Sequence, residues 1–178
     1  YLFSPQVKKT GIATVWLNGD IASVVFPLHY KDIIFPPLTA HHERITITKS
    51  GILDIRDALE DPMAKENHVS CNFLFVVSED DLNWNSAYYA EQACNILKHG
   101  KTNYEVLRHP NTGYFLEVPY MPHYPSGVHA AVGQVVAFEG ETKVHADAQV
   151  DTWRRVQEFF RLHLQFSSST SHLKIFQY

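Results

Sequence analysis

Two stretches of this sequence carry side chains that could serve as the acid and the base of a catalytic site. Glu79, Asp80 and Asp81 directly follow one strand-like run, and the loop 110–114 directly follows another. The carboxyl ends of parallel strands meet at one edge of a sheet, where ligands bind. A carboxylate in the first turn would then orient a base in the second. Asp80 and Asp81 could instead cap a helix, and the pattern alone favours that interpretation.

The residues around these turns predict alternating strands and helices. The run Asn72–Ser78 is almost continuously apolar, which is typical of a strand buried on both faces of a parallel sheet. We predict further strands at 11–17 and 103–109. Between the last two strands, residues 86–100 repeat apolar side chains at helical spacing, and Gly100 is placed to end the helix.

A second helix is predicted at 145–164. An apolar stripe recurs there at steps of three and four residues, through Val150, Trp153, Val156, Phe160 and Leu164. We expect the aromatic residues of this helix to pack in the core, because large aromatic side chains are usually buried. The alternation of strands and helices favours an α/β fold with a mostly parallel sheet.

Composition narrows the classes of function. The chain has 178 residues, enough for one domain or a large part of one, and its net charge of −4 leaves no basic excess for nucleic acid. No apolar stretch is long enough to span a bilayer. Cys71 and Cys94 form no CxxC pair, so we expect reduced thiols in an intracellular compartment.

Several catalytic and cofactor motifs are absent from the sequence. No HExxH or paired Cys/His spacing predicts a metal site, and neither GxGxxG nor a P-loop predicts a nucleotide cofactor. We therefore expect no metal and no cofactor. A GxSxG nucleophile elbow is absent as well, so a hydrolase of that type would need a nucleophile that precedes Tyr1.

A long excursion, residues 18–70, separates the first predicted strand from the second. An insertion at the carboxyl end of a strand is expected to lie over the site. Residues 166–178 lose all periodicity, and we expect them to form a loose tail. One domain is thus expected over residues 1–165.

Four segments in combination resemble a known family. They read "ATVWLNGD…LHYKDIIFPPL", "LFVVSEDDLNWNSAYYAEQA", "LKHGKTNYEVLRHPNTGYFLEVPYMP" and "HADAQVDTWRRVQEFFRLHL". They are similar to the C-terminal half of the acyl-CoA thioesterases and of their relative, bile acid-CoA:amino acid N-acyltransferase. The resemblance covers roughly Ser4 to Leu164. It implies the C-terminal portion of an α/β-hydrolase fold, with the serine or cysteine nucleophile in a missing N-terminal part of the same protein.

The resemblance also implies particular site residues. Asp81 matches the triad acid of the family, and its neighbour Asp80 is the less favoured candidate. The triad histidine of the family follows a loop glycine, which is Gly113 here, so the histidine position is occupied by Tyr114. Asn111 stands where the family usually has the first glycine of that loop.

Tyrosine at position 114 changes the expected chemistry. A triad base accepts the proton of the nucleophile and returns it to the leaving group near neutral pH. An imidazole with a pKa near 6.5 can do both, whereas a phenol with a pKa of about 10 stays protonated. His109, His123 and His129 lie nearby in the sequence. We expect none of them to take over, because the geometry required of a general base is demanding.

By resemblance, the expected function is that of an acyl-CoA thioester hydrolase of the serine-esterase type in fatty acid metabolism. Acyl-CoA would be the substrate, and this chain itself is expected to be inactive or impaired. Two alternatives stay open: an N-acyltransferase that conjugates acyl groups to an amino acid, and a non-catalytic relative that binds acyl-CoA or a protein. We expect a cytoplasmic location, with the peroxisome and the mitochondrion as alternatives.

Overall fold

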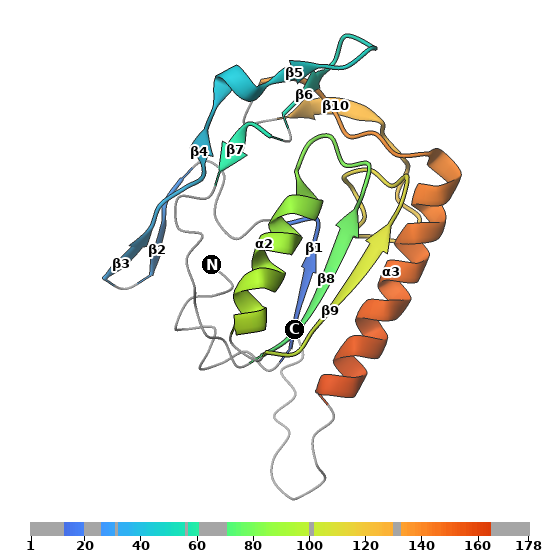
Figure 1. The fold of residues 1–178 in the computed structure, drawn as a ribbon. Helices are drawn as coiled ribbons and strands as arrows, with labels where there is room; N and C mark the ends of the chain where they lie inside the picture. The colour runs from blue at the N-terminus through green and yellow to red at the C-terminus, as the bar shows by residue number, and fades with distance from the viewer. Residues whose placement is uncertain are drawn as a thin grey trace, which may run out of the picture.

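A three-stranded parallel sheet forms the centre of the fold (Figure 1), with β8 (Asn72–Ser78) between β1 (Ala13–Leu17) and β9 (Tyr104–His109). This arrangement confirms the predicted α/β fold class. The computed structural model describes residues 13–19, 26–30, 32–55, 57–60, 71–99, 102–129 and 133–164. Gly100 and the predicted tail 166–178 lie outside the described residues.

Strand β8 is buried on both faces. Each of its residues from Phe73 to Val77 is at most 1% exposed. Its backbone pairs with β1 on one side, where Ala13 lies opposite Asn72, and with β9 on the other. An unbroken apolar run is therefore required here, because neither face of the strand meets water.

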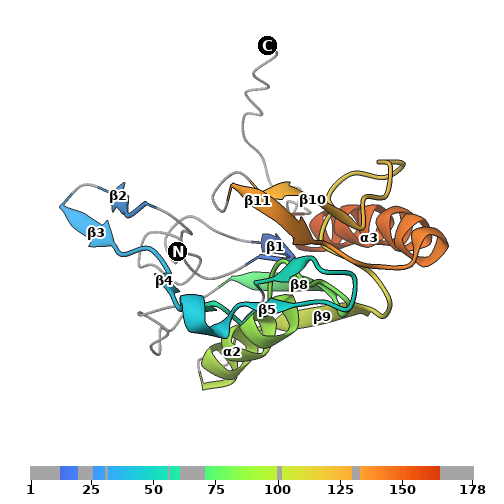
Figure 2. The ribbon, with the colours of Figure 1, turned by 90° about the horizontal axis from the view of Figure 1, so that it is seen from above.

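Two helices cover opposite faces of this sheet (Figure 2): α2 (Ser86–His99) and α3 (Thr142–His163). Because side chains alternate along a strand, β8 serves both helices. Its odd-numbered residues belong to the cluster under α2, with Phe73, Phe75, Val77, Ala90, Ala93 and Leu97. Its even-numbered residues belong to the cluster under α3, with Leu74, Val76, Leu116, Ala148 and Phe159. No helix within the described residues is long and apolar enough to cross a membrane.

Helix α3 differs from its prediction in its start and in its buried face. It begins at Thr142 because Glu141 caps it, accepting hydrogen bonds from the first backbone N–H groups. Trp153 is 48% exposed, so the expectation that the aromatic residues of this helix pack in the core is wrong for this residue. The buried residues of α3 are His145, Ala148, Gln149, Thr152 and Phe159.

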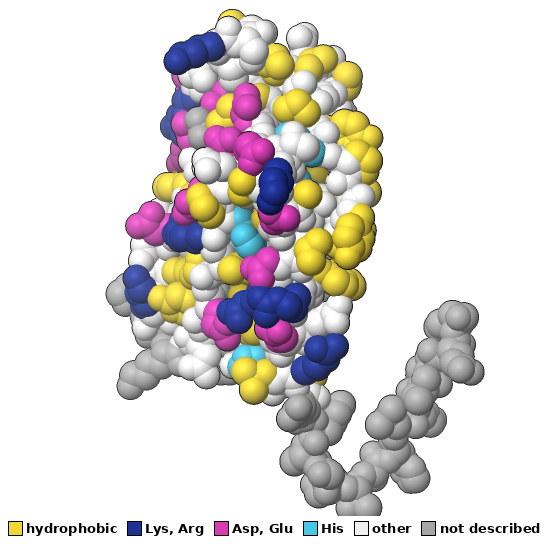
Figure 3. All heavy atoms as spheres, turned by 90° about the vertical axis from the view of Figure 1, so that its right-hand side faces the viewer, with side chains coloured by type: hydrophobic (Ala, Val, Ile, Leu, Met, Phe, Trp, Pro, Cys, Tyr) yellow, Lys and Arg dark blue, Asp and Glu magenta, His cyan; other side chains and the backbone are white. Residues whose placement is uncertain are grey.

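The outer face of α3 carries interleaved acidic and basic side chains (Figure 3). Lys143 pairs with Asp147 at 2.7 Å, and Arg154 pairs with Glu158 at 2.8 Å. Exposed pairs of this kind contribute only about 0.2–1 kcal/mol each. The docking of α3 therefore depends on its buried face, which is unusually polar.

Most of the short strands form a second layer beyond the carboxyl ends of the central strands, and one pair lies to the left of α2 in the view of Figure 1. Two antiparallel pairs are β2 (Leu28–Tyr30) with β3 (Ile33–Phe35) and β4 (Thr39–Ala40) with β7 (Leu59–Glu60); a 3-10 turn spans His42–Arg44. A four-stranded sheet runs in the order β10 (Ser126–His129), β11 (Gln134–Ala137), β6 (Leu53–Asp54) and β5 (Thr46–Ile47). That the excursion 18–70 covers a site stays a prediction, although the pairing of β6 with β11 ties part of it to this edge.

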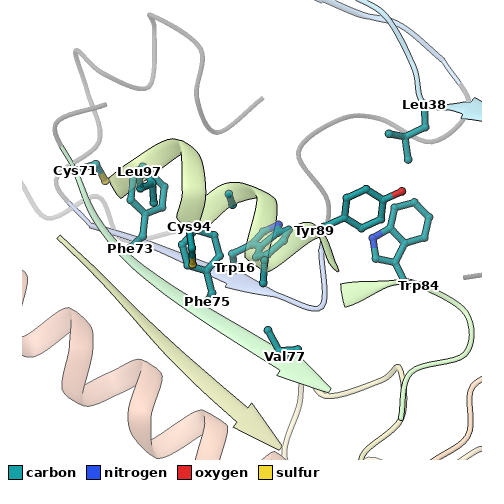
Figure 4. Packing of buried hydrophobic residues seen from close by; sticks show 12 residues of the cluster. Trp16, Leu38, Cys71, Phe73, Phe75, Val77, Trp84, Tyr89, Cys94 and Leu97 are labelled. Atoms are coloured by element: carbon teal, nitrogen blue, oxygen red, sulfur yellow. The ribbon is translucent and has the colours of Figure 1, made fainter. Parts of the chain in front are cut away.

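Aromatic rings fill the core between the sheet and α2 (Figure 4). The ring of Phe75 is fully buried, and its centroid lies 4.9 Å from that of Trp16 and 5.7 Å from that of Phe73. Cys71 and Cys94 are buried in the same cluster as free thiols. This cluster holds α2 against β8, and it thereby positions the turn that joins them.

We predict that Phe75→Ala lowers the free energy of unfolding by about 3–5 kcal/mol, because it opens a cavity that this rigid cluster cannot close. Urea denaturation followed by tryptophan fluorescence measures the loss. Ile47→Ala is the control, since Ile47 is 71% exposed and its truncation should cost little. Equal shifts in the two midpoints would show that the cluster does not carry the stability assigned to it.

Candidate functional site

Asp81 lies buried in the turn between β8 and α2, with 2% of its surface exposed. One carboxylate oxygen, Oδ1, accepts hydrogen bonds from the backbone N–H groups of Asn83 and Trp84, at 3.0 and 2.9 Å. The other, Oδ2, accepts one from the hydroxyl of Ser86 at 2.8 Å. Such donors compensate the cost of burying a carboxylate and fix the direction in which it points.

Helix capping, the interpretation favoured by the pattern for Asp80 and Asp81, is wrong for both residues. The side chain of Asn85 accepts from the N–H of Tyr88 and so caps α2. Asp81 instead organises the turn before the helix. Asp80 points elsewhere, and its Oδ2 accepts from the N–H of Gly140 at 3.1 Å.

The acidic turn is joined directly to the loop that follows β9. The N–H of Glu79 donates to the carbonyl of His109, and the N–H of Asp80 donates to that of Thr112, both at 3.0 Å. These bonds extend the pairing of β8 and β9 past the ends of the strands. They set the acidic turn and the loop in one register, at the carboxyl edge of the sheet.

Tyr114 lies in this loop, half-buried among aromatic rings. Its ring centroid is 5.6 Å from that of Phe138 and 4.7 Å from that of Phe115. Its N–H donates to the carbonyl of Phe138 at 3.1 Å. The loop therefore accommodates a large aromatic side chain at this position by packing it on the segment that follows β11.

Asn18 is a residue of this edge that the sequence did not single out. It follows β1 with a φ of 40°, is 4% exposed, and its Nδ2 donates both to Ser78 Oγ and to the carbonyl of Tyr114, each at 2.7 Å. Its Oδ1 accepts from the N–H of Ser78 at 2.7 Å. The Asn-Gly pair at this point signalled a turn. No local signal shows which distant backbone groups such a side chain will meet.

Close backbone contacts explain two small residues of the loop. A Cβ on Gly113 would lie 2.0 Å from the carbonyl oxygen of Glu139, so only glycine fits. Asn111 has a φ of 53°, a left-handed conformation that glycine and asparagine tolerate better than other residues. This tolerance explains why Asn111 can occupy a position at which the family that the sequence resembles usually has glycine.

Two of the three histidines near Tyr114 in the sequence are hydrogen-bonded to other groups. His109 is buried, and its Nε2 lies 2.9 Å from the hydroxyl of Thr152 on α3. Nε2 of His123 donates to the carbonyl of Glu139 at 2.9 Å. His129 lies on β10. The expectation that none of them acts as the base stays a prediction.

Over the described residues, no cluster of three His, Cys, Asp or Glu side chains could hold a metal ion.

Comparison with known proteins decides the family. Residues 3–166 match the family described as "BAAT / Acyl-CoA thioester hydrolase C terminal". The chain belongs to this family. It is 40% identical over 172 residues to human acyl-coenzyme A thioesterase 6, and 38% identical over 172 residues to human acyl-coenzyme A thioesterase 2, mitochondrial. It is 37% identical over 178 residues to mouse acyl-coenzyme A thioesterase 6.

These alignments confirm the resemblance to acyl-CoA thioesterases and also limit what it covers. They include 92%, 92% and 95% of this chain, but only 41%, 36% and 42% of the three relatives. The chain thus spans about two fifths of the length of the curated relatives that it matches. In this chain, Asp81 and Tyr114 lie in the segments that follow two adjacent parallel strands, β8 and β9.

We predict that Gly113→Ala destabilises the protein by about 3 kcal/mol, because the new methyl group meets backbone that cannot move aside cheaply. Gly51→Ala is a matched control. Gly51 has a φ of 79° and open space around it, so alanine there should cost only about 1 kcal/mol of backbone strain. Urea midpoints measure both changes. A loss at Gly113 no larger than that at Gly51 would contradict the close approach.

We predict that the protein becomes less stable as the pH falls from 7.5 to 5.5. Burial lowers the pKa of His109 despite the opposing charge of Asp151, and burial lowers the pKa of His145 despite the carbonyl of Phe115. The unfolded chain then binds more protons below about pH 6.5 than the native protein does. The free energy of unfolding therefore decreases as the pH decreases. Charge repulsion from His123, whose ring centroid lies 4.9 Å from that of His145, further lowers the pKa of His145.

Urea unfolding at the two pH values measures this loss. The double variant His109→Gln, His145→Asn should reduce the difference between the two free energies. Ala146→Gln, on the exposed side of α3, should leave it unchanged. A pH response that persists in full in the double variant would assign it to other groups.

Proposed function

We propose that this chain forms the acid and base region of an acyl-CoA thioester hydrolase whose base position has been changed to tyrosine. A segment preceding Tyr1 would supply the serine or cysteine nucleophile. Asp81 would orient the base, and position 114 is where that base belongs. The observation that carries the proposal is the joining of the two turns by backbone hydrogen bonds, in a chain that matches the family from residue 3 to residue 166.

The proposed reaction cleaves a thioester in two steps. The nucleophile attacks the acyl carbonyl and loses its proton to the base, and coenzyme A leaves as a thiol that takes this proton up. Water then attacks the acyl-enzyme and gives a proton to the base, the bond between the acyl group and the nucleophile breaks, the base returns the proton to the nucleophile, and the free acid is released. The buried, hydrogen-bonded carboxylate of Asp81 suits the acid of such a triad, since it would hold the base in one orientation.

Tyr114 would not support the proton transfers of this two-step reaction. A phenol of ordinary pKa, about 10, does not accept a proton near neutral pH, so neither step is assisted. Acyl-CoA binding does not require the base. We therefore propose that the protein hydrolyses acyl-CoA slowly, and a non-catalytic role in binding acyl-CoA is the second candidate. Conjugation to an amino acid stays the third, and a serine at the upstream nucleophile position would count against it.

The proposal also includes an intracellular location. Cys71 and Cys94 are free and buried, as in proteins from reducing compartments. We favour the cytoplasm, and the mitochondrion is the first alternative because one relative carries that word in its name.

We predict that Tyr114→His raises the rate of acyl-CoA hydrolysis by about 10²–10⁴-fold in the protein that includes the upstream nucleophile, since a positioned general base contributes that much. Release of coenzyme A from a long-chain acyl-CoA, followed with a thiol reagent, measures the rate. Tyr124→His is the matched control, because Tyr124 is 54% exposed in the neighbouring loop and histidine there should change nothing.

Adding Asp81→Asn to Tyr114→His should abolish the gain, since the new imidazole would lose its orienting partner. A gain that persists in full when Asp81→Asn is added to Tyr114→His would overturn the assignment of these two residues. Calorimetry with the same acyl-CoA separates the second candidate: binding by the unchanged protein without turnover supports it, and absence of binding contradicts it.

A further inference from the structure

A buried histidine of α3 contacts the backbone on both sides of position 114. His145 is 2% exposed. Its Nδ1 accepts a hydrogen bond from the N–H of Gly113 at 3.2 Å, and its Nε2 donates one to the carbonyl of Phe115 at 2.6 Å. The side chain therefore bridges the residue before Tyr114 and the residue after it, from a helix about thirty residues further along the chain.

These two bonds define the protonation state of the ring. A carbonyl oxygen can only accept, so Nε2 must carry hydrogen, and an N–H can only donate, so Nδ1 must be bare. His145 is thus a neutral imidazole with its proton on Nε2. A second proton on Nδ1 would oppose the N–H of Gly113 inside the protein, where neither group could find water.

Neighbouring bonds hold the same short segment from other directions. Asn18 donates to the carbonyl of Tyr114 at 2.7 Å, and Gln149 donates to that of Phe115 at 3.2 Å. The N–H of Tyr114 itself is bonded to the segment after β11. The backbone of residues 113–115 is consequently tied to β1, to α3 and to the second layer, which leaves position 114 little freedom to shift.

Simple core packing does not explain a histidine at this place. The buried face of α3 carries polar side chains, His145, Gln149 and Thr152, beside the apolar Ala148 and Phe159. The two polar atoms of His145 both meet loop backbone rather than side chains. Any residue of similar size could fill space, but only a group with an acceptor and a donor at this separation can satisfy both backbone groups.

We propose that His145 is the positioning residue for the 113–115 loop, and that its bonds to Gly113 and Phe115 set the direction in which the side chain at position 114 leaves the backbone. The positional claim stands on the geometry alone. Its catalytic meaning rests on the function proposed above, in which position 114 belongs to the base. His145 touches neither substrate nor nucleophile in this role, and it acts through the loop.

Two amide variants separate the two bonds. In His145→Asn, the amide oxygen can take the place of Nδ1 and accept from Gly113. In His145→Gln, the amide nitrogen can take the place of Nε2 and donate to Phe115. Hydrogen exchange of the Gly113 amide, followed by NMR, should accelerate at least tenfold in His145→Gln and stay near its original rate in His145→Asn. The matched controls Ala146→Gln and Ala146→Asn, one position along α3 and exposed, should leave the exchange of the Gly113 amide unchanged.

The activity readout uses the Tyr114→His protein. There His145→Gln should lower kcat at least tenfold with little change in KM, and His145→Asn should restore part of the loss. A residue that merely stabilises the fold would lower the urea midpoint without this split between kcat and KM. Because hydrogen exchange needs no turnover, an inactive Tyr114→His protein would sink the proposed function and leave the positional claim to be decided by NMR.

The unchanged protein provides a test that needs no variant. Nitrogen-15 chemical shifts of the ring should show a protonated Nε2 and a bare Nδ1 in His145 at pH 7. The opposite tautomer, or a doubly protonated ring, would overturn the proposal even if every variant failed to fold. Equal exchange rates for Gly113 in His145→Gln and in the unchanged protein would overturn it as well.

Discussion

Hydrogen bonding of the backbone at residues 113–115 is the constraint on which this edge of the protein depends. The segment is neither strand nor helix, so it has no regular partner for its N–H and carbonyl groups. A buried polar group left without a partner costs about 1–3 kcal/mol, and several lie here in a row. Asn18, which follows β1, and His145, on α3, supply missing partners. The buried face of α3 is polar because it forms hydrogen bonds with this backbone as well as packing on the apolar side chains of β8.

Because of this constraint, the backbone geometry at residues 113–115 is independent of the side chain at position 114. The bonds that hold position 114 involve backbone atoms, so they do not depend on which side chain stands there. Tyrosine can replace histidine and find room against Phe115 and Phe138 without disturbing the loop. The backbone geometry at position 114 is thus compatible with the tyrosine found there.

Periodicity predicted the elements well because the central sheet is regular. The apolar run of β8 follows from burial on both faces, and the spacing of α2 follows from packing against one of them. Periodicity failed on α3, where the stripe through Trp153 lies partly in solvent and the buried line runs through His145, Gln149 and Thr152. A hydrophobic pattern cannot show a helix face whose partners are backbone carbonyls and amides. For the same reason the pattern assigned helix capping to the acidic pair, although Asn85 performs it.

The sequence by itself determined the family and the order of the three central strands and the two helices, and it proposed positions for an acid and a base. Those features are local runs and motifs, and each can be recognised without knowledge of what lies across the fold. The tertiary structure alone decided how these positions are held. Asn18 and His145 lie far from Tyr114 along the chain, and they reach its loop only because β1 and α3 both pack on β8. Contacts of that kind arise from the arrangement of elements in space, and no spacing along the chain encodes them.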